Sequence, residues 1–244
     1  MKSRTDIIDR YKGALIPVWS HNPQEDEITI SSGILIEADG RRGVLACDHS
    51  NHADRPPVSD LEWKIGIRAQ IPASPHEPPG DTDSAVLSIP SDVKVSGTPI
   101  MQDEVSDDPS IGDGVLVLGF SGYSQGAYQA REGIVSTRGR GLWWANLYIP
   151  SGVSGGPVVC RNSGELLGTV QLSFIDSKKN EGEKVHVQGA LTGFNTHLHP
   201  AFNHLKLEEG GWPVRQDKDA YLLRTVRAER MPPEGLGLSN VPTL

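Results

Sequence analysis

The sequence predicts an all-β protein, either a sandwich or a pair of barrels. Short segments rich in apolar and β-branched residues recur along the chain, and Gly, Pro, Asn and Asp separate them, a pattern typical of sandwiches and barrels. No long segment with a 3.6-residue period interrupts them, which argues against alternating strands and helices. The length of 244 residues fits one large all-β domain or two small barrels that share an interface.

The first half of the chain contains five segments with strand patterning. The sequence ADGRRG (38–43) carries the Asp-Gly signal of a tight hairpin turn between two of them. A Pro-rich loop is expected over 72–82, and a linker between two halves over 102–112. The expected strands are 14–20, 28–38, 43–48, 63–71 and 84–90.

The second half repeats this alternation, and helical patterning appears only late, at 200–205 and 217–230. We therefore expect one folded domain over 1–205. Its N-terminal barrel would occupy about 14–101 and its C-terminal barrel about 112–205, with a C-terminal extension over 206–244. The expected strands are 113–120, 130–137, 143–149, 156–160, 166–175 and 185–194.

Charge and cysteine content narrow the setting of the protein. A net charge of −8 argues against nucleic acid or an anionic membrane as the main partner. Two cysteines, Cys47 and Cys160, are too few for a disulfide-built scaffold. The N-terminus lacks an apolar leader, and no apolar run approaches the roughly 20 residues of a membrane span. We expect a cytoplasmic protein with free thiols.

The segment SGVSGGPVVC (151–160) places Ser154 in a glycine-rich turn that opens into an apolar strand. A serine nucleophile needs a nearby base and two N–H donors for the developing oxyanion. If the turn curls around Ser154, the N–H groups of Gly152 and Ser154 can converge on one point. The alternative is an ordinary glycine-rich β-turn, which the segment alone does not exclude.

Candidates for the base and its orienting acid lie upstream, at strand ends. His49 follows an apolar strand in GVLACDH, and Asp83 precedes one in DSAVLSI. Both positions allow a rigid sheet to hold a polar group at its edge. The order His, Asp, Ser, each in such a context, predicts an acyl-transfer triad.

These segments resemble the trypsin-like (chymotrypsin-fold) serine peptidases, and more closely their bacterial HtrA/Deg branch. The resemblance rests on SSGILIEADGRRGVLACDHS, DSAVLSI, IGDGVLVLGFSGYSQGAYQAREGIVST and GVSGGPVVCRNSGELLGTVQ, and it covers roughly residues 14 to 195. It implies two packed antiparallel six-stranded β-barrels with a short C-terminal helix. It also implies a bacterial serine endopeptidase with a protein or peptide substrate. We expect no cofactor and no metal. Because a protease without a secretion signal needs restraint in a cytoplasm, we also expect its activity to be regulated by a protein partner.

Residue by residue, the resemblance implies Ser154 as nucleophile, His49 as general base and then acid, and Asp83 as the group that orients His49. The N–H groups of Gly152 and Ser154 would form the oxyanion hole. An extended peptide would pair with the strand edge at 170–173. The substrate-binding residues would be Tyr148, Gln171, Leu172 and Ser173.

The departures from the family pattern also carry expectations. Val153 stands where digestive relatives place an Asp that pairs with a freed N-terminus, so we expect no activation by N-terminal insertion. The residues after 205 are too few for the PDZ domain of HtrA/Deg enzymes. A histidine cluster at His197, His199 and His204 has no cysteine or acid at ligand spacing, which favours a structural role. Two alternatives remain open: an inactive relative that holds a peptide, and an esterase with the same triad.

Overall fold

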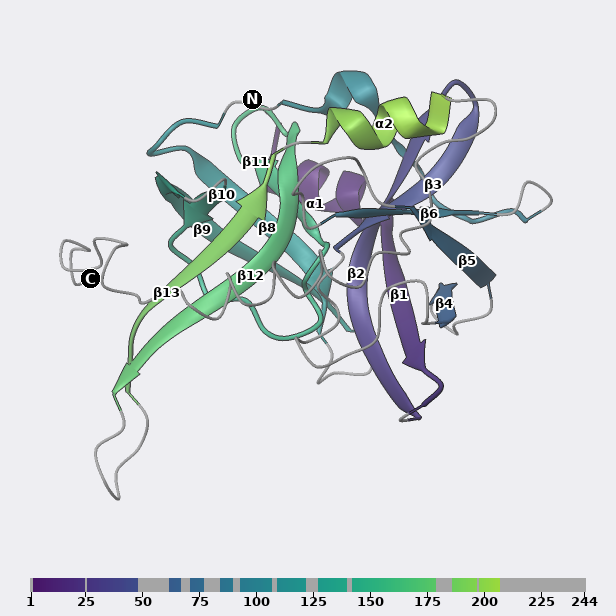
Figure 1. Cartoon of the computed structure of the whole chain (residues 1–244). Helices are drawn as coiled ribbons and strands as arrows, with labels where there is room; N and C mark the ends of the chain where they lie inside the picture. The colour runs from purple at the N-terminus through teal and green to yellow at the C-terminus, as the bar shows by residue number, and fades with distance from the viewer. Residues whose placement is uncertain are drawn as a thin grey trace.

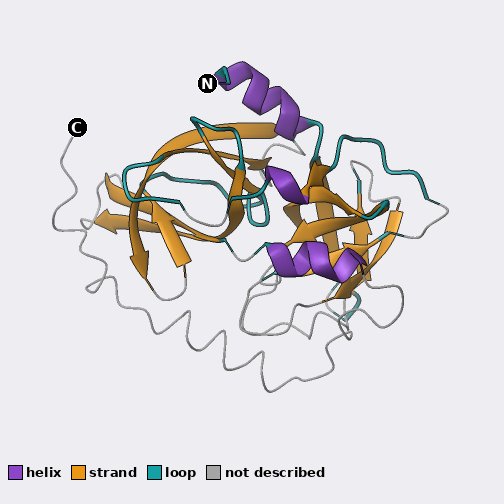
Figure 2. Cartoon of the chain, turned by 90° about the horizontal axis from the view of Figure 1, so that it is seen from above, coloured by secondary structure: helices purple, strands orange, loops and turns teal. Residues whose placement is uncertain are grey.

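The computed structural model describes residues 2–24, 26–47, 62–66, 71–76, 84–89, 93–106, 109–121, 127–139, 142–178, 186–196 and 198–206. Figure 1 shows their strands in two groups, and Figure 2, turned by 90°, shows the same groups side by side. The predicted all-β fold with two barrel-like halves and a short C-terminal helix is confirmed.

The first half folds into one curled sheet that is antiparallel except at its edge strand β7. Its order is β1-β4-β5-β6-β3-β2-β7, and an additional pairing of β1 with β2 joins two strands that are not neighbours in this order. The two-residue strand β7 pairs with β2 in parallel. The bounds are β1 Leu15–Asn22, β2 Glu27–Ala38, β3 Arg41–Ala46, β4 Glu62–Ile65, β5 Ile71–His76, β6 Ala85–Ser88 and β7 Ile100–Met101.

The second half closes into a six-stranded barrel in the order β10-β13-β12-β11-β8-β9. Strands β12 and β13 are longer than the barrel needs and run together past it (Figure 1). The bounds are β8 Gly114–Phe120, β9 Tyr128–Gly139, β10 Leu142–Ala145, β11 Pro157–Cys160, β12 Leu166–Lys178 and β13 His186–Asn195. The predicted strands of this half are all present, with ends that differ by a few residues.

The predicted hairpin between β2 and β3 is present. Ala38 pairs with Arg41, which leaves a two-residue turn of Asp39 and Gly40. Both turn residues have positive φ, 51° and 77°, as the tight turns favoured in hairpins require.

The predicted strand at 63–71 and the predicted loop at 72–82 are wrong in part. The chain leaves β4 at Gly66, which has a φ of 96°, and strand β5 then occupies Ile71–His76. Residues 71–73 of β5 pair with β4, and residues 74–76 pair with β6. Among the described strands, each part of β5 is therefore paired on one side only. A strand with an unpaired side tolerates proline, because proline has no N–H to donate to a neighbouring strand.

Helix α1 (Arg4–Lys12) was not expected, because helical patterning in the sequence is strongest near the C-terminus. A capping box starts α1: the Ser3 hydroxyl accepts from the Asp6 N–H, and the Asp6 carboxylate accepts from the Ser3 N–H. Helix α2 (His199–Lys206) agrees with the helical turn expected at 200–205. The helix expected at 217–230 lies outside the described residues.

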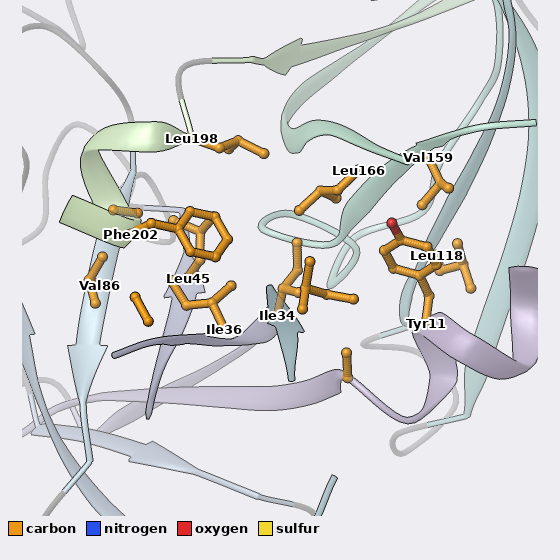
Figure 3. Close-up of a cluster of buried hydrophobic side chains, with 14 of the residues drawn as sticks. Tyr11, Ile34, Ile36, Leu45, Val86, Leu118, Val159, Leu166, Leu198 and Phe202 are labelled. Carbon is orange, nitrogen blue, oxygen red and sulfur yellow. The ribbon is translucent and has the colours of Figure 1, made fainter. Parts of the chain in front are cut away.

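One apolar cluster joins the two halves. Tyr11 of α1, Ile34 of β2 and Phe202 of α2 lie in the same cluster as Leu118 and Val159 of the second barrel. Figure 3 shows these side chains in a continuous layer between the sheets. The Tyr11 hydroxyl also donates to the Gly164 carbonyl oxygen at 3.2 Å. Burial of this layer fixes how the barrels face each other, and so fixes the surfaces at their junction.

An ion pair ties α1 to the connection between the barrels, where Gln102–Glu104 form one turn of 3-10 helix. The Arg10 Nε donates to Glu104 Oε1 at 3.0 Å, and Arg10 also donates to the carbonyl oxygens of Thr98 and Pro99.

Among the described residues, no helix is long and apolar enough to cross a membrane.

Candidate active site at the junction of the barrels

Ser154 lies in the turn between Pro150 and β11, and its side chain is partly buried. The Gly156 N–H donates to the Val153 carbonyl oxygen at 2.8 Å and closes the turn around Ser154. Gly152 has a φ of 94°, which a residue with a Cβ rarely adopts. The glycines of this turn therefore serve its geometry, as the sequence predicted.

Ser32 of β2 holds this turn against the first barrel. The backbone N–H of Ser32 donates to the Ser154 carbonyl oxygen at 2.8 Å. The Ser32 hydroxyl donates to the Gly152 carbonyl oxygen at 2.8 Å and accepts from the Phe120 N–H at 2.8 Å. One fully buried serine thus fixes the carbonyl groups on both sides of Val153 and connects them to the end of β8.

Gly155 brings the turn into contact with the end of β3. A Cβ at Gly155 would lie 2.1 Å from the Ser32 carbonyl oxygen and 2.9 Å from the Cys47 backbone nitrogen. The turn that carries Ser154 therefore touches Cys47, the last described residue before His49. His49 itself lies outside the described residues.

Strand β6, which begins two residues after Asp83, starts at the same end of the sheet. Ala46 of β3 pairs with Ala85 of β6 in antiparallel register. The chain therefore leaves β3 toward His49 beside the point where it enters β6 from Asp83. Asp83 also lies outside the described residues, but the next residue, Ser84, is buried, and its hydroxyl lies 3.4 Å from the Asn195 amide nitrogen of β13.

The backbone N–H groups of Gly152 and Ser154, the predicted oxyanion donors, have no acceptor within the described part of the chain. No described residue accepts a hydrogen bond from either nitrogen, whereas the neighbouring Val153 N–H donates to the Pro150 carbonyl oxygen at 3.4 Å. An oxyanion hole requires donors that the folded protein leaves unused. The two nitrogens meet this requirement.

Strand β12 lies directly beside the turn that carries Ser154, residues 151–156. The Gly155 N–H donates to the Val170 carbonyl oxygen at 2.8 Å, and the Val170 N–H donates to the Gly156 carbonyl oxygen at 2.9 Å. A β-bulge follows between Val170 and Leu172. The predicted substrate-binding residues Gln171, Leu172 and Ser173 therefore follow directly after Val170, the residue of β12 that is hydrogen-bonded to this turn.

Two polar atoms on this part of β12 are buried without a partner. Gln171 is 1% exposed, and its Oε1 has no hydrogen bond, while its Nε2 lies 3.5 Å from the Thr169 hydroxyl. The Ser173 hydroxyl is also buried and unpaired. Buried polar atoms are usually satisfied, so these two atoms are exceptions among the described side chains.

No hydrogen bond or ion pair joins the Tyr148 side chain to the turn among the described residues. Its side chain is 43% exposed, while its neighbours Leu147 and Ile149 are buried in the second barrel. The alternation leaves Tyr148 on the surface just before the turn. Its role as a pocket residue stays a prediction.

No three His, Cys, Asp or Glu residues in the described ranges are placed to hold a metal ion. Of the three histidines singled out in the sequence, His197 lies outside those ranges. The His199 Nδ1 lies 3.2 Å from the Gln102 amide nitrogen, and His204 is buried in α2. The two described histidines thus participate in packing around α2.

Sequence reasoning missed Ser32. Its only signal in the sequence is its place before Gly33 in SSGIL. A Cβ at Gly33 would lie 2.4 Å from a Val44 methyl group and 2.8 Å from a Val18 methyl group. The glycine reflects crowding inside the first sheet, and it gives no indication that the adjacent serine holds a turn 120 residues away.

Comparisons with known proteins support the fold. No family model matches the chain, and no curated protein matches it. The structure is similar to the crystal structure of the Rv3671c protease from M. tuberculosis in its active form, with a TM-score of 0.58 and 18% sequence identity over 86% of each chain. With the strand topology described above, this similarity defines the fold as a chymotrypsin-like double barrel.

Proposed function

We propose that this protein is a serine endopeptidase that cleaves peptide bonds through an acyl-enzyme formed on Ser154. The observation that carries the proposal is the Ser32 clamp, by which we mean the two hydrogen bonds from Ser32 to the carbonyl oxygens of Gly152 and Ser154. These carbonyls belong to the turn of residues 151–156, which we call the nucleophile turn. The clamp holds Ser154 at the junction of the two sheets, against the end of β3 that leads to His49. The fold shared with a protease adds support.

In the proposed acylation, the Ser154 hydroxyl oxygen attacks the scissile carbonyl carbon, and His49 takes the hydroxyl proton. Asp83 holds the imidazole in the required tautomer and stabilises its charged form. The N–H groups of Gly152 and Ser154 donate to the oxyanion of the tetrahedral intermediate. His49 then gives its proton to the leaving amine, and the peptide bond breaks.

Deacylation repeats the sequence with water as the nucleophile. His49 takes a proton from water, the hydroxide attacks the acyl carbonyl carbon, and the oxyanion hole again receives the negative charge. The ester bond to Ser154 breaks when His49 returns the proton to the serine oxygen. A removed oxyanion donor in such a site costs about 10²–10³ in kcat.

The substrate would bind as an extended strand along Gln171–Ser173 of β12. A strand edge next to the nucleophile gives backbone hydrogen bonds, and side-chain pockets add preference. Tyr148, Leu172 and Ser173 would line the pocket for the side chain before the cut bond. Because none is acidic, we propose a preference for a small or medium apolar side chain over Arg or Lys.

A fluorophosphonate probe tests the nucleophile. The wild-type protein should be labelled on Ser154, whereas Ser154→Ala should not be labelled. Ser151→Ala is the matched control, because Ser151 is exposed in the same turn and should leave labelling unchanged. His49→Ala should lower the labelling rate strongly, since the serine then lacks its base. An unlabelled wild-type protein, or labelling that survives in Ser154→Ala, would overturn the assignment.

The same proteins separate two other functions. An inactive peptide-binding module would resist the probe but bind peptides with equal affinity in wild type and Ser154→Ala. An esterase would take the probe and hydrolyse p-nitrophenyl esters, yet leave unfolded protein substrates intact. Cleavage of an unfolded protein, with mass spectrometry of the products, supports the endopeptidase and gives its preference.

We also propose that the protein acts in the bacterial cytoplasm and that it is related to the HtrA/Deg branch of the family. We further propose that a partner protein controls its activity. Cys47 and Cys160 are free thiols, which fits a reducing compartment. If the protein is denatured without a reductant and then alkylated, both cysteines should be modified. A bridge between Cys47 and Cys160 would contradict the cytoplasmic setting.

A further inference from the structure

Strands β12 and β13 continue beyond the barrel as a two-stranded ribbon. On the β11 side, β12 is paired only as far as Thr169, which faces Pro157. On the other side, its pairing with β13 continues from Thr169 to Lys178. Figure 1 shows the far end of this ribbon well outside the barrel. Past the nucleophile turn, no described strand covers the outer edge of β12.

The pairing pattern shows which backbone groups face this open edge. Val170 directs both its N–H and its C=O toward the nucleophile turn, so the pair Val170 and Phe194 is not hydrogen-bonded across the two strands. Antiparallel pairs alternate between the two kinds. Beyond the bulge, the pairs Ser173–Thr192 and Ile175–Ala190 are again of the non-bonded kind. The backbone groups of Ser173 and Ile175 therefore point outward.

The direction of β12 determines which part of a substrate can use this edge. From Val170, beside the nucleophile turn, β12 runs away from Ser154 toward Lys178. A peptide in antiparallel pairing with β12 runs toward Ser154, so the residues that precede the cut bond lie along the ribbon. From Ser173 to Lys178 the edge continues for five residue steps, or roughly 17 Å at about 3.4 Å per residue.

We propose that this open edge of β12, Ser173 to Lys178, is an extended docking strand for unfolded polypeptide upstream of the cleavage site. The inference deepens the proposed endopeptidase function and rests on it. Recognition runs through backbone groups, so the ribbon accepts many sequences but requires an extended chain of about six residues before the cut bond.

A series of peptidyl phosphonate probes tests the edge, with one warhead and three, four, five or six residues before it. The labelling rate of Ser154 should rise by about tenfold between three and six residues, as expected for a few added backbone hydrogen bonds. A fluorophosphonate without a peptide serves as the reference for chemical competence. If the reference labels Ser154 and the rates do not depend on length, the docking strand is refuted while the catalytic function stands.

N-methylation of the six-residue probe tests backbone pairing without change to the protein. Removal of one N–H at a time should lower the labelling rate at alternate positions only, because alternate residues of a strand face the partner. Ile175→Pro removes an outward N–H and should reduce the six-residue probe to the rate of the three-residue probe. Ile175→Val keeps that N–H and should leave the rate unchanged. A length effect without alternation would indicate a side-chain pocket and overturn the proposal.

The affinity of peptides for the Ser154→Ala variant tests the docking strand independently of catalysis. Fluorescent peptides that span the site and carry six upstream residues should bind about tenfold more tightly than peptides with three. This result would support the ribbon even if the wild-type protein proved inactive toward the probes, and equal affinities would overturn it. Sedimentation of the free protein provides the last check: dimers that dissociate on shortening of the ribbon would assign its edge to a second copy of the chain.

Discussion

The backbone N–H of Ser32 donates to the carbonyl oxygen of Ser154 at 2.8 Å, across 122 residues of sequence. The hydroxyl of the same serine bonds to Gly152 and Phe120. The position of the proposed nucleophile therefore depends on the first sheet, although the turn itself belongs to the second barrel. A substitution that removes the hydrogen bonds of Ser32 should therefore lower catalysis, although Ser32 itself is not proposed to contact the substrate.

Ser32→Ala should weaken the site while the fold persists. The change leaves the Gly152 carbonyl oxygen and the Phe120 N–H without their buried partner, which costs about 1–3 kcal/mol in free energy of unfolding. The fluorophosphonate labelling rate should fall about tenfold, since the proposed oxyanion donors, the N–H groups of Gly152 and Ser154, flank the released carbonyl. Urea unfolding and labelling kinetics measure both effects. Ser31→Ala, on the opposite face of β2, is the control, and an equal loss of labelling there would show that the effect is not specific to the clamp.

Gly155→Ala should abolish labelling or prevent folding. Gly155 has a φ of 79°, and a Cβ there would lie 2.1 Å from the Ser32 carbonyl oxygen, a distance that backbone atoms cannot tolerate. Gly139→Ala is the matched control, because a Cβ at Gly139 would meet nothing within 4 Å. Circular dichroism and probe labelling should distinguish the two variants. A Gly155→Ala protein with wild-type stability and labelling would contradict the described turn.

Local patterns in the sequence predicted most strands and the centre of the candidate site. The Asp39–Gly40 turn and the glycines around Ser154 are local signals, because each residue needs a conformation that few residue types adopt. Strand β5 was missed because prolines usually exclude a strand, and its one-sided pairing is set by β4 and β6. Helix α1 was missed because its stability comes from packing of Ile7 and Tyr11 against both barrels.

The role of Ser32 could not be predicted for a related reason. Its hydroxyl bonds to a carbonyl 120 residues away, and one serine in a strand carries no mark of such a partner. The ribbon edge is similar, since the sequence predicted the strand but not that β11 stops short of it. Both features depend on which distant segments of the chain lie side by side in the fold and in which register. The local pattern around Ser32 or around β12 does not show these pairings.

Val153→Asp should destabilise the protein without creating an activation switch. Val153 is 2% exposed within the apolar cluster of the second barrel, and an unpaired buried carboxylate costs several kcal/mol. Val153→Thr keeps the shape and should cost about 1–3 kcal/mol. Thermal unfolding measures both changes. For the wild-type protein, a short peptide added before Met1 should leave the labelling rate unchanged, and a loss of labelling would indicate that a free N-terminus is required.

Glu104→Gln should lower stability in a pH-dependent way. Burial alone would raise the pKa of Glu104, but the hydrogen bonds from Arg10 and from the Met101 N–H outweigh it and lower the pKa from the ordinary value of a glutamate. A carboxyl with a lowered folded-state pKa stabilises the fold above its unfolded-state pKa and loses that contribution as pH falls through the folded-state value. The wild type should therefore exceed Glu104→Gln by about 1 kcal/mol at pH 7, and the difference should shrink below about pH 4.5. Urea unfolding across this range measures it, with Glu165→Gln, an exposed change, as the control. A difference that stays constant down to pH 3 would show that the Arg10 ion pair does not set the stability of α1 on the barrels.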